Sequence, residues 1–377
     1  MILFLIKKYR EAFGVLLIAI TLVSCSVREK GYTITGQING DEEVLQNSRI
    51  YMRLANARNV IYDSAELKNG KFIFKGQLTT PEKYLLSVKG LPHSIPILLE
   101  NDRYTVEAES KALGNASIKG GESQQMHNSF MQKNKDIAKK YDLDRLMQYL
   151  SNEDTDYQKN PKVAEAIEKA NSEMRRVIDS LIALNPLSFY SLLNLYETVQ
   201  VREYEEAKGR TDEFERSNLY NQSRYLKRVK EIIAKRESLL PGKIAPDLQL
   251  LNSKGDTLQL GEILSRKERS LIIFWASWNI EALRFIEMCK EIESLKLNDK
   301  AQIITIAVND NEENWHKVIK ERPIKRADFI EASVNTAIEK FNINVIPKLY
   351  LVDASGTILL SDIPLSSALS NIDAYFK

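Results

Sequence analysis

The chain has 377 residues, 44% of them hydrophobic and 28% charged, the composition of an ordinary globular protein with two or three domains. Its 53 basic residues nearly balance its 51 acidic ones, giving a formal net charge of +2. This balance excludes nucleic acid as an expected partner, because phosphate binding needs a clustered basic excess. The sequence holds two cysteines, Cys25 and Cys289, so any thiol chemistry depends on where they lie.

The N-terminus has the pattern of an export signal. Basic residues lie between positions 7 and 10, and an apolar run follows over 13–23. That run is shorter than the stretch of about 20 residues that crosses a bilayer, but it fits the apolar part of a secretory signal. It leads into Ser24 and Cys25, an order that resembles the bacterial lipobox, in which the cysteine is acylated and becomes the new N-terminus. The alternative is an uncleaved anchor helix with an incidental cysteine.

This resemblance to lipoproteins also predicts a location. We expect a signal peptide over 1–24, lipid on Cys25 and a short linker over 25–30. Several acyl chains hold a protein on a membrane far more firmly than one chain does. Because Ser26 rather than Asp follows the cysteine, the resemblance implies the outer membrane. The lack of an acidic run after the cysteine favours the face toward the periplasm.

Residues 31–122 are predicted to form an antiparallel β-sandwich or a small barrel. Apolar residues alternate over 32–38, as in a strand with one buried face. Asn69 and Gly70 can supply the two positive φ angles of a tight hairpin turn, and a second hairpin is predicted over 98–104. Several short strands separated by regular turns are typical of both architectures.

Three short motifs lie in this β-region: Tyr62-Asp63-Ser64, Gly70-Lys71-Phe72 and Leu99-Glu100-Asn101. They resemble the β-domain that precedes thioredoxin domains in Bacteroidota lipoproteins. That family domain has no established activity, so the resemblance predicts a fold and no function.

Residues 123–240 are predicted to be helical. Apolar residues recur there at helical spacing, glycines are few, and Pro161 and Pro186 mark breaks between helices. The period is too irregular for a long coiled coil. We interpret the charged faces of this segment as solvated surface.

Residues 241–377 have the element order of a thioredoxin fold. An apolar strand, buried on both faces, is predicted over 271–278, and a helix begins near Asn279. Further buried strands are predicted over 303–308 and 348–352, and the second of these leads into a hairpin. The predicted fold class is therefore α+β and multidomain, with a β-sandwich or barrel, a helical middle segment and a C-terminal α/β thioredoxin fold.

Three motifs within this last region carry a second resemblance: Gly242-x-x-Ala245-Pro246-Asp247, Phe274-Trp275-Ala276-Ser277-Trp278 and Val345-Ile346-Pro347. In their order they resemble the membrane-anchored TlpA-like thioredoxins and the wider alkyl hydroperoxide reductase/thiol-specific antioxidant superfamily. In that family the tryptophan is followed by Cys-x-x-Cys. Here the sequence after Trp278 is Asn279-Ile280-Glu281-Ala282.

Asn279 and Ala282 are therefore degenerate active-site positions. Asn279 takes the place of the nucleophilic cysteine, and Ala282 that of the resolving one. Dithiol exchange needs a thiolate that attacks and a second thiol that releases the mixed disulfide, and neither residue supplies one. Both suit an ordinary helix start, because Asn is a good N-cap and Ala the best helix former. We expect no catalytic residue here.

Cys289 is a weak substitute for the missing thiols. It lies ten residues beyond Asn279, which is about 15 Å along a helix. A free cysteine on an apolar helical face behaves as a small buried hydrophobe, and this is the interpretation we favour. With Cys25 acylated, Cys289 has no partner for a disulfide within the chain.

The motif at Pro347 predicts a candidate binding groove. The resemblance implies a cis peptide between Ile346 and Pro347 that faces the active-site loop, and in the family this loop holds extended substrate backbone. Trp278, Ile346 and Pro347 are therefore the candidate groove residues. A turn that serves the fold and binds nothing is the alternative.

Metal and cofactor sites are not expected. His93, His127 and His316 are scattered without the spacing of zinc ligands, and no glycine-rich phosphate loop occurs in the sequence.

Two main functions follow from these residues. The first is a non-catalytic lipoprotein, anchored to the membrane through Cys25, that binds a protein or peptide of the cell envelope in the groove. The second is a thiol-disulfide oxidoreductase or antioxidant protein, as the family resemblance implies. A purely structural role of the β-domain in the envelope is a third possibility.

Overall fold

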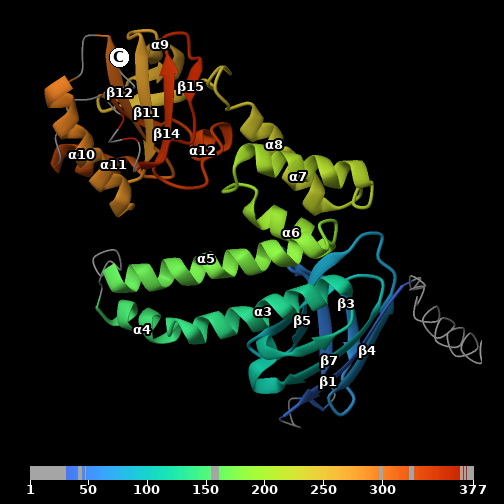
Figure 1. Cartoon of the computed structure of the whole chain (residues 1–377). Coiled ribbons are helices and arrows are strands. Elements are labelled where there is room, and N and C mark those ends of the chain that lie inside the picture. Colours follow the sequence, from blue (N-terminus) through green and yellow to red (C-terminus); the bar gives the residue numbers. More distant parts are fainter. Residues whose placement is uncertain are drawn as a thin grey trace, which may run out of the picture. The chain divides into compact units, whose positions relative to one another are not determined.

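The computed structural model describes residues 31–40, 45–46, 48–153, 161–296, 300–321, 327–365, 368 and 371 (Figure 1). They form two compact units: the first runs to residue 194 and includes 214–225, and the second comprises 195–213 and the chain from 226 onward. The central helices are thus divided between the units. The predicted signal peptide and Cys25 lie outside the described residues. Among the described helices, none is long and apolar enough to cross a membrane.

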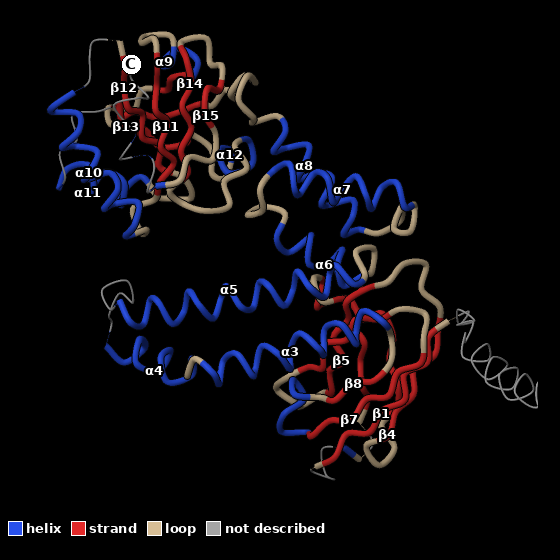
Figure 2. The backbone as a smooth tube through the Cα atoms, in the orientation of Figure 1, coloured by secondary structure: helices blue, strands red, loops and turns tan. Residues whose placement is uncertain are grey.

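Two four-stranded sheets form the β-domain of the first unit (Figure 2). The strand orders are β4-β1-β7-β8 and β3-β2-β5-β6, and apolar residues of both sheets share one core. The domain is therefore a sandwich, and the pairing is antiparallel except between β1 and β7, which are parallel. The strands are β1 (Tyr32–Asn39), β2 (Arg49–Leu54), β3 (Ala57–Glu66), β4 (Lys71–Gly76), β5 (Glu82–Val88), β6 (Ser94–Leu99), β7 (Arg103–Glu109) and β8 (Ser117–Lys119).

The turns between these strands differ in part from the prediction. Asn69 and Gly70 do form a tight turn, with φ angles of 51° and 74°. Lys68 and Lys71 pair antiparallel across this turn, although the strands on either side of it, β3 and β4, belong to different sheets. The hairpin predicted over 98–104 is wrong, because β6 and β7 lie in different sheets. Alternating apolar residues reveal a strand's buried face but not its pairing partner.

The middle segment is helical, as predicted. The part of this segment that belongs to the first unit ends at Arg224 and Tyr225. These two residues contact the sandwich through Glu82 of β5, which is 9% exposed. The Tyr225 hydroxyl and the Arg224 guanidinium each donate a hydrogen bond of 2.6 Å to Glu82 Oε1. A short 3-10 helix, η1 (Ser110–Asn115), precedes β8, and the helices are α3 (Glu122–Lys140), α4 (Leu143–Glu153), α5 (Pro161–Leu184), α6 (Phe189–Thr198), α7 (Tyr204–Ser217) and α8 (Arg224–Glu237).

The second unit contains a seven-stranded sheet in the order β10-β9-β13-β12-β11-β14-β15. Strands β11, β12 and β13 are parallel, and β14 runs antiparallel to β11, as the thioredoxin prediction requires. Strand β13 was not predicted. The strands are β9 (Gln249–Asn252), β10 (Thr257–Gln259), β11 (Arg269–Trp275), β12 (Ala301–Ala307), β13 (Ala327–Glu331), β14 (Lys348–Asp353) and β15 (Ile358–Leu360).

Helices cover both faces of this sheet (Figure 1). Leu271 and Trp275 of β11 pack on the side of α10 (Ile280–Lys296) and α11 (Glu312–Glu321). The alternate residue Phe274 packs on the side of α12 (Thr336–Lys340), and α9 (Leu260–Leu264) adds to the same core. The central strand is buried on both faces, as its apolar run predicts. The loop from β11 to α10 carries the predicted site.

Candidate functional site

Asn279 is the N-cap of α10. Its side-chain Oδ1 accepts a hydrogen bond of 2.8 Å from the backbone N–H of Ala282, three residues into the helix. The predicted cap is confirmed. Ala282 itself is fully buried in a cluster with Trp275 and Trp315. Position 282, which the resemblance equates with a resolving cysteine, is therefore filled by a methyl group in the core.

The other end of the same amide reaches the loop at Pro347. Asn279 Nδ2 donates a hydrogen bond of 3.2 Å to the carbonyl oxygen of Ile346. The Ile346–Pro347 peptide is cis, as the resemblance implied. A primary amide can donate and accept at once, whereas a thiolate can only accept. Asn279 thus links the start of α10 to the cis-proline loop in a way that a reactive cysteine thiolate could not.

Trp278 lies on the surface, held by the loop after β12. Its indole Nε1 donates a hydrogen bond of 3.2 Å to the carbonyl oxygen of Asn309. The next residue, Asp310, accepts hydrogen bonds of 2.5 Å and 2.8 Å from the backbone N–H and the hydroxyl of Ser277. The tryptophan side chain is nevertheless 58% exposed. Sequence reasoning missed Asn309 and Asp310, whose short polar side chains look like ordinary loop residues.

A buried carboxylate fixes that supporting loop. Glu331, at the end of β13, is 7% exposed. Its Oε1 accepts backbone N–H groups from Asn309 at 2.9 Å and from Asn335 at 3.1 Å, and its Oε2 accepts that of Ala337 at 2.9 Å. Three N–H donors compensate the burial of the charge. Through Asn309, Glu331 helps to position Trp278.

Three large, exposed apolar residues are chain neighbours of the two residues that the Asn279–Ile346 hydrogen bond joins. Trp278 and Ile280 are the neighbours of Asn279 and are 58% and 65% exposed, and Val345, beside Ile346, is 58% exposed. We call Trp278, Ile280 and Val345 the apolar patch. Neighbouring exposed apolar groups are typical of a surface that binds another molecule. Of the predicted groove residues, Trp278 is exposed, Ile346 is half-buried and packs against the core, and Pro347 is buried.

Cys289, which the sequence predicts to be a buried free cysteine, belongs to α10, but its side chain lies outside the described residues. Its burial stays a prediction.

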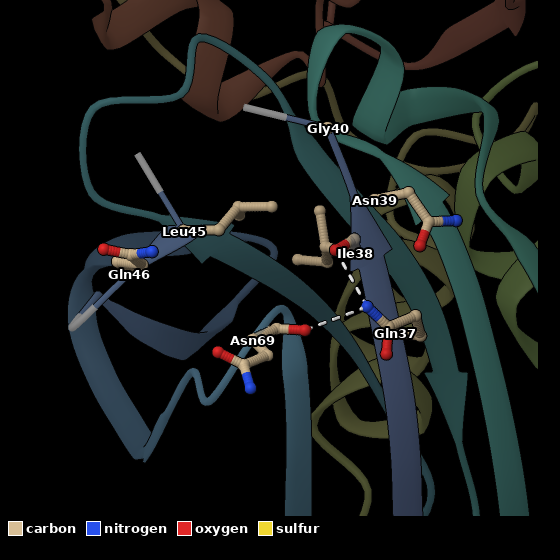
Figure 3. Close-up of a pocket in the computed structure, with 7 residues that line it drawn as sticks. All are labelled: Gln37, Ile38, Asn39, Gly40, Leu45, Gln46 and Asn69. Carbon is tan, nitrogen blue, oxygen red and sulfur yellow. Dashed lines mark hydrogen bonds between the residues drawn. The ribbon is translucent and has the colours of Figure 1, made fainter. Parts of the chain in front are cut away.

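The first unit contains a separate hollow of about 480 Å³ at one end of the sandwich (Figure 3). Ile38 and Leu45 supply its apolar side, and their side chains point toward one another. The Gln37 amide donates to the carbonyl oxygens of Ile38 and Asn69 at 3.2 Å and 3.1 Å. Asn39, Gly40 and Gln46 complete the lining. None of the residues predicted to form the site lies there.

Two parts of the chain match family models. Residues 269–358 match a family described as thioredoxin-like, and residues 32–126 match a domain of unknown function, DUF4369. The first match and the strand order of the second unit agree on a C-terminal thioredoxin-like domain. No curated protein matches the chain.

Several solved structures from Bacteroides align with part of the chain. A thiol-disulfide oxidoreductase from Bacteroides fragilis NCTC 9343 is 24% identical, with a TM-score of 0.31, over 34% of this chain and 99% of its own. The thioredoxin domain of a thiol-disulfide oxidoreductase from Bacteroides vulgatus is 19% identical, with a TM-score of 0.32, over 37% and 100%. A thiol:disulfide interchange protein from Bacteroides sp. is also 19% identical, with a TM-score of 0.32, over 37% and 91%. The fold assignment rests on the family match and the strand order, not on these alignments.

Proposed function

We propose that this protein is a lipoprotein, anchored through Cys25 to the outer membrane and facing the periplasm, that binds an extended apolar segment of another envelope protein without exchanging disulfides. The observation that carries the proposal is the double hydrogen bond of Asn279, which caps α10 and reaches Ile346. It joins the two segments that bear the apolar patch while leaving the patch exposed.

The chemistry at this site supports binding over exchange. Asn279 has no thiolate to attack a disulfide, and Ala282 has no thiol to release a mixed one. Asn279 also occupies one of the two lone pairs of the Ile346 carbonyl oxygen. A partner is therefore held mainly by side-chain contacts with the apolar patch rather than by main-chain hydrogen bonds at Ile346.

Tryptophan fluorescence tests the binding half of the proposal. The chain has three tryptophans, and Trp275 and Trp315 are buried at 0% and 1% exposure. Collisional quenching by acrylamide therefore reports on Trp278. A synthetic twelve-residue peptide rich in leucine and valine is expected to protect Trp278 of the full-length protein from acrylamide. A matched peptide in which serine replaces the apolar residues is expected to give no protection, and equal protection by both would contradict the proposal.

An insulin-reduction assay with dithiothreitol tests the alternative, a thiol-disulfide oxidoreductase. We expect the full-length protein to leave the rate unchanged. An accelerated rate that disappears in the Cys289→Ser variant would establish the oxidoreductase instead.

A further inference from the structure

The turn between α6 and α7, residues 199–203, is fixed to the second unit by an arginine. Arg236 of α8 donates hydrogen bonds of 2.6 Å and 2.8 Å to the carbonyl oxygens of Val199 and Arg202. Its guanidinium also lies 5.7 Å over the ring centre of Tyr204. Charge-assisted hydrogen bonds of this kind are stronger than neutral ones. The backbone of the turn therefore has a defined position.

The same turn makes contact with the loop that leads to Pro347. Gln200 and Asn342 exchange two side-chain hydrogen bonds of 2.8 Å and 3.1 Å. The Asn344 amide adds a weaker one of 3.4 Å to the carbonyl oxygen of Gln200. A segment of the helical region, some 140 residues earlier in the chain, thus lies directly beside the cis-proline loop.

Exposed valines follow both partners of this contact. Val201, directly after Gln200, is 73% exposed, and Val345, directly after Asn344, is 58% exposed. Single exposed apolar residues are common on protein surfaces. Here a hydrogen bond joins the residues that precede them, so Val201 and Val345 follow the two sides of one contact, although Val201 lies outside the thioredoxin-like domain.

Four acidic residues on the segments that adjoin this surface are exposed. Of the exposed basic residues there, Arg284 of α10 and Lys340 of α12 both already have interaction partners. Glu281 on α10 and the pair Glu312 and Glu313 on α11 are exposed, and so is Glu203 at the end of the turn. None of these four carboxylates makes an ion pair in the part of the chain that the structure describes. The basic residue of the turn, Arg202, is already paired with a glutamate of α7. A basic partner complements such a rim.

We propose that the turn over 199–203 is a third part of the binding surface and that Val201 contacts the bound segment. The occupant is an extended segment of another protein, apolar in its centre and flanked by lysine or arginine. This inference rests on the proposed function and adds to it a residue outside the thioredoxin-like domain and a charge preference.

Fluorescence anisotropy with labelled peptides tests the inference on the full-length protein. The probe is a synthetic peptide with a leucine–valine centre and two lysines at each end, and its counterpart has glutamates at the ends. We expect Val201→Ser to weaken binding of the lysine peptide roughly threefold to tenfold, because part of a valine side chain loses its apolar contact. Val60→Ser is the matched control, since Val60 is a 52% exposed valine of β3 in the other unit.

The outcomes separate the inference from the function on which it rests. Loss of binding in Trp278→Ser with full binding in Val201→Ser would overturn the role of the turn and leave the proposed function standing. Full binding in both variants would overturn the proposed function itself. Equal affinity for the lysine and glutamate peptides would overturn the charge preference. Protection of Trp278 that rises with protein concentration alone would identify a second copy of this chain as the occupant and overturn the peptide partner.

Discussion

The helical segment is attached in two chemically different ways. In the first unit, Arg224 and Tyr225 contact the sandwich through the buried carboxylate of Glu82. In the second unit, Gln200 contacts the cis-proline loop through the neutral amide of Asn342. A buried charge is costly to leave without its partner, whereas half-buried amides can exchange protein partners for water. The contact at Glu82 therefore stabilises the first unit strongly. The contact between Gln200 and Asn342 positions the turn over 199–203 but contributes little to the stability of the second unit.

Glu82→Ala is expected to give the largest effect. It removes the carboxylate that accepts from both the Tyr225 hydroxyl and the Arg224 guanidinium, and leaves Arg224 with its neutral acceptors, Asn56 and the Tyr225 hydroxyl. This should lower the free energy of unfolding of the first unit by about 2–3 kcal/mol. Burial raises the pKa of Tyr225, so its hydroxyl remains a donor well above neutral pH. Urea unfolding followed by far-UV circular dichroism measures the change. Glu66→Ala, which removes a well-exposed ion pair with Lys68, is the control and should change little.

Tryptophan emission sharpens this first test, because Trp275, Trp278 and Trp315 all belong to the second unit. The midpoint of urea unfolding followed by tryptophan emission should stay unchanged in the Glu82→Ala variant. A shift as large as that seen by circular dichroism would show that the two contacts do not stabilise separate units.

Asn279→Ala is expected to have an intermediate effect. It removes both the helix cap and the hydrogen bond to Ile346, and should destabilise the second unit by about 1–2 kcal/mol, measured by tryptophan emission in urea. Asn279→Asp is the matched variant, since aspartate keeps the cap but has no donor for Ile346. It should lose about half as much. The aspartate carboxylate also faces the Ile346 carbonyl oxygen, so equal losses in both variants would mean that the cap contributes no more than this repulsion costs.

The amide pair should give the smallest effect. Gln200→Ala and Asn342→Ala are each expected to cost about 1 kcal/mol or less, and the double variant should cost less than their sum because both remove the same hydrogen bonds. A double-mutant cycle on the tryptophan emission midpoint measures the coupling. Strict additivity would show that the pair does not stabilise the second unit.

Much of this molecule follows from local patterns in its sequence. The alternation over 32–38 places Tyr32, Ile34 and Ile38 in the sandwich core. Asn279 caps a helix because its short amide suits that position in any protein. Such features depend on neighbours in the chain, which the sequence displays directly.

The features that sequence reasoning missed depend on distant partners. Strand β13 went unpredicted because Asp328 and Glu331 break its apolar pattern, yet both are buried. Asp328 accepts a hydrogen bond from the Thr305 hydroxyl, and Glu331 accepts three backbone N–H groups. Because acidic residues are mostly exposed, a carboxylate in a sequence is predicted to lie on the surface unless the groups that donate hydrogen bonds to it are known. The contact between Gln200 and Asn342 was hidden for the same reason.

The two hydrogen bonds of Asn279 also oppose a change to cysteine at this position. Asn279→Cys alone would remove the amide donor to Ile346 and weaken the helix cap, while position 282 still lacked a thiol. A thiol at the fully buried position 282 would have a raised pKa and react slowly. A change at position 279 alone thus reduces stability without permitting dithiol exchange, and a change at position 282 alone supplies no attacking thiolate. The bridge between the helix and the loop therefore ties the identity of residue 279 to the stability of the domain.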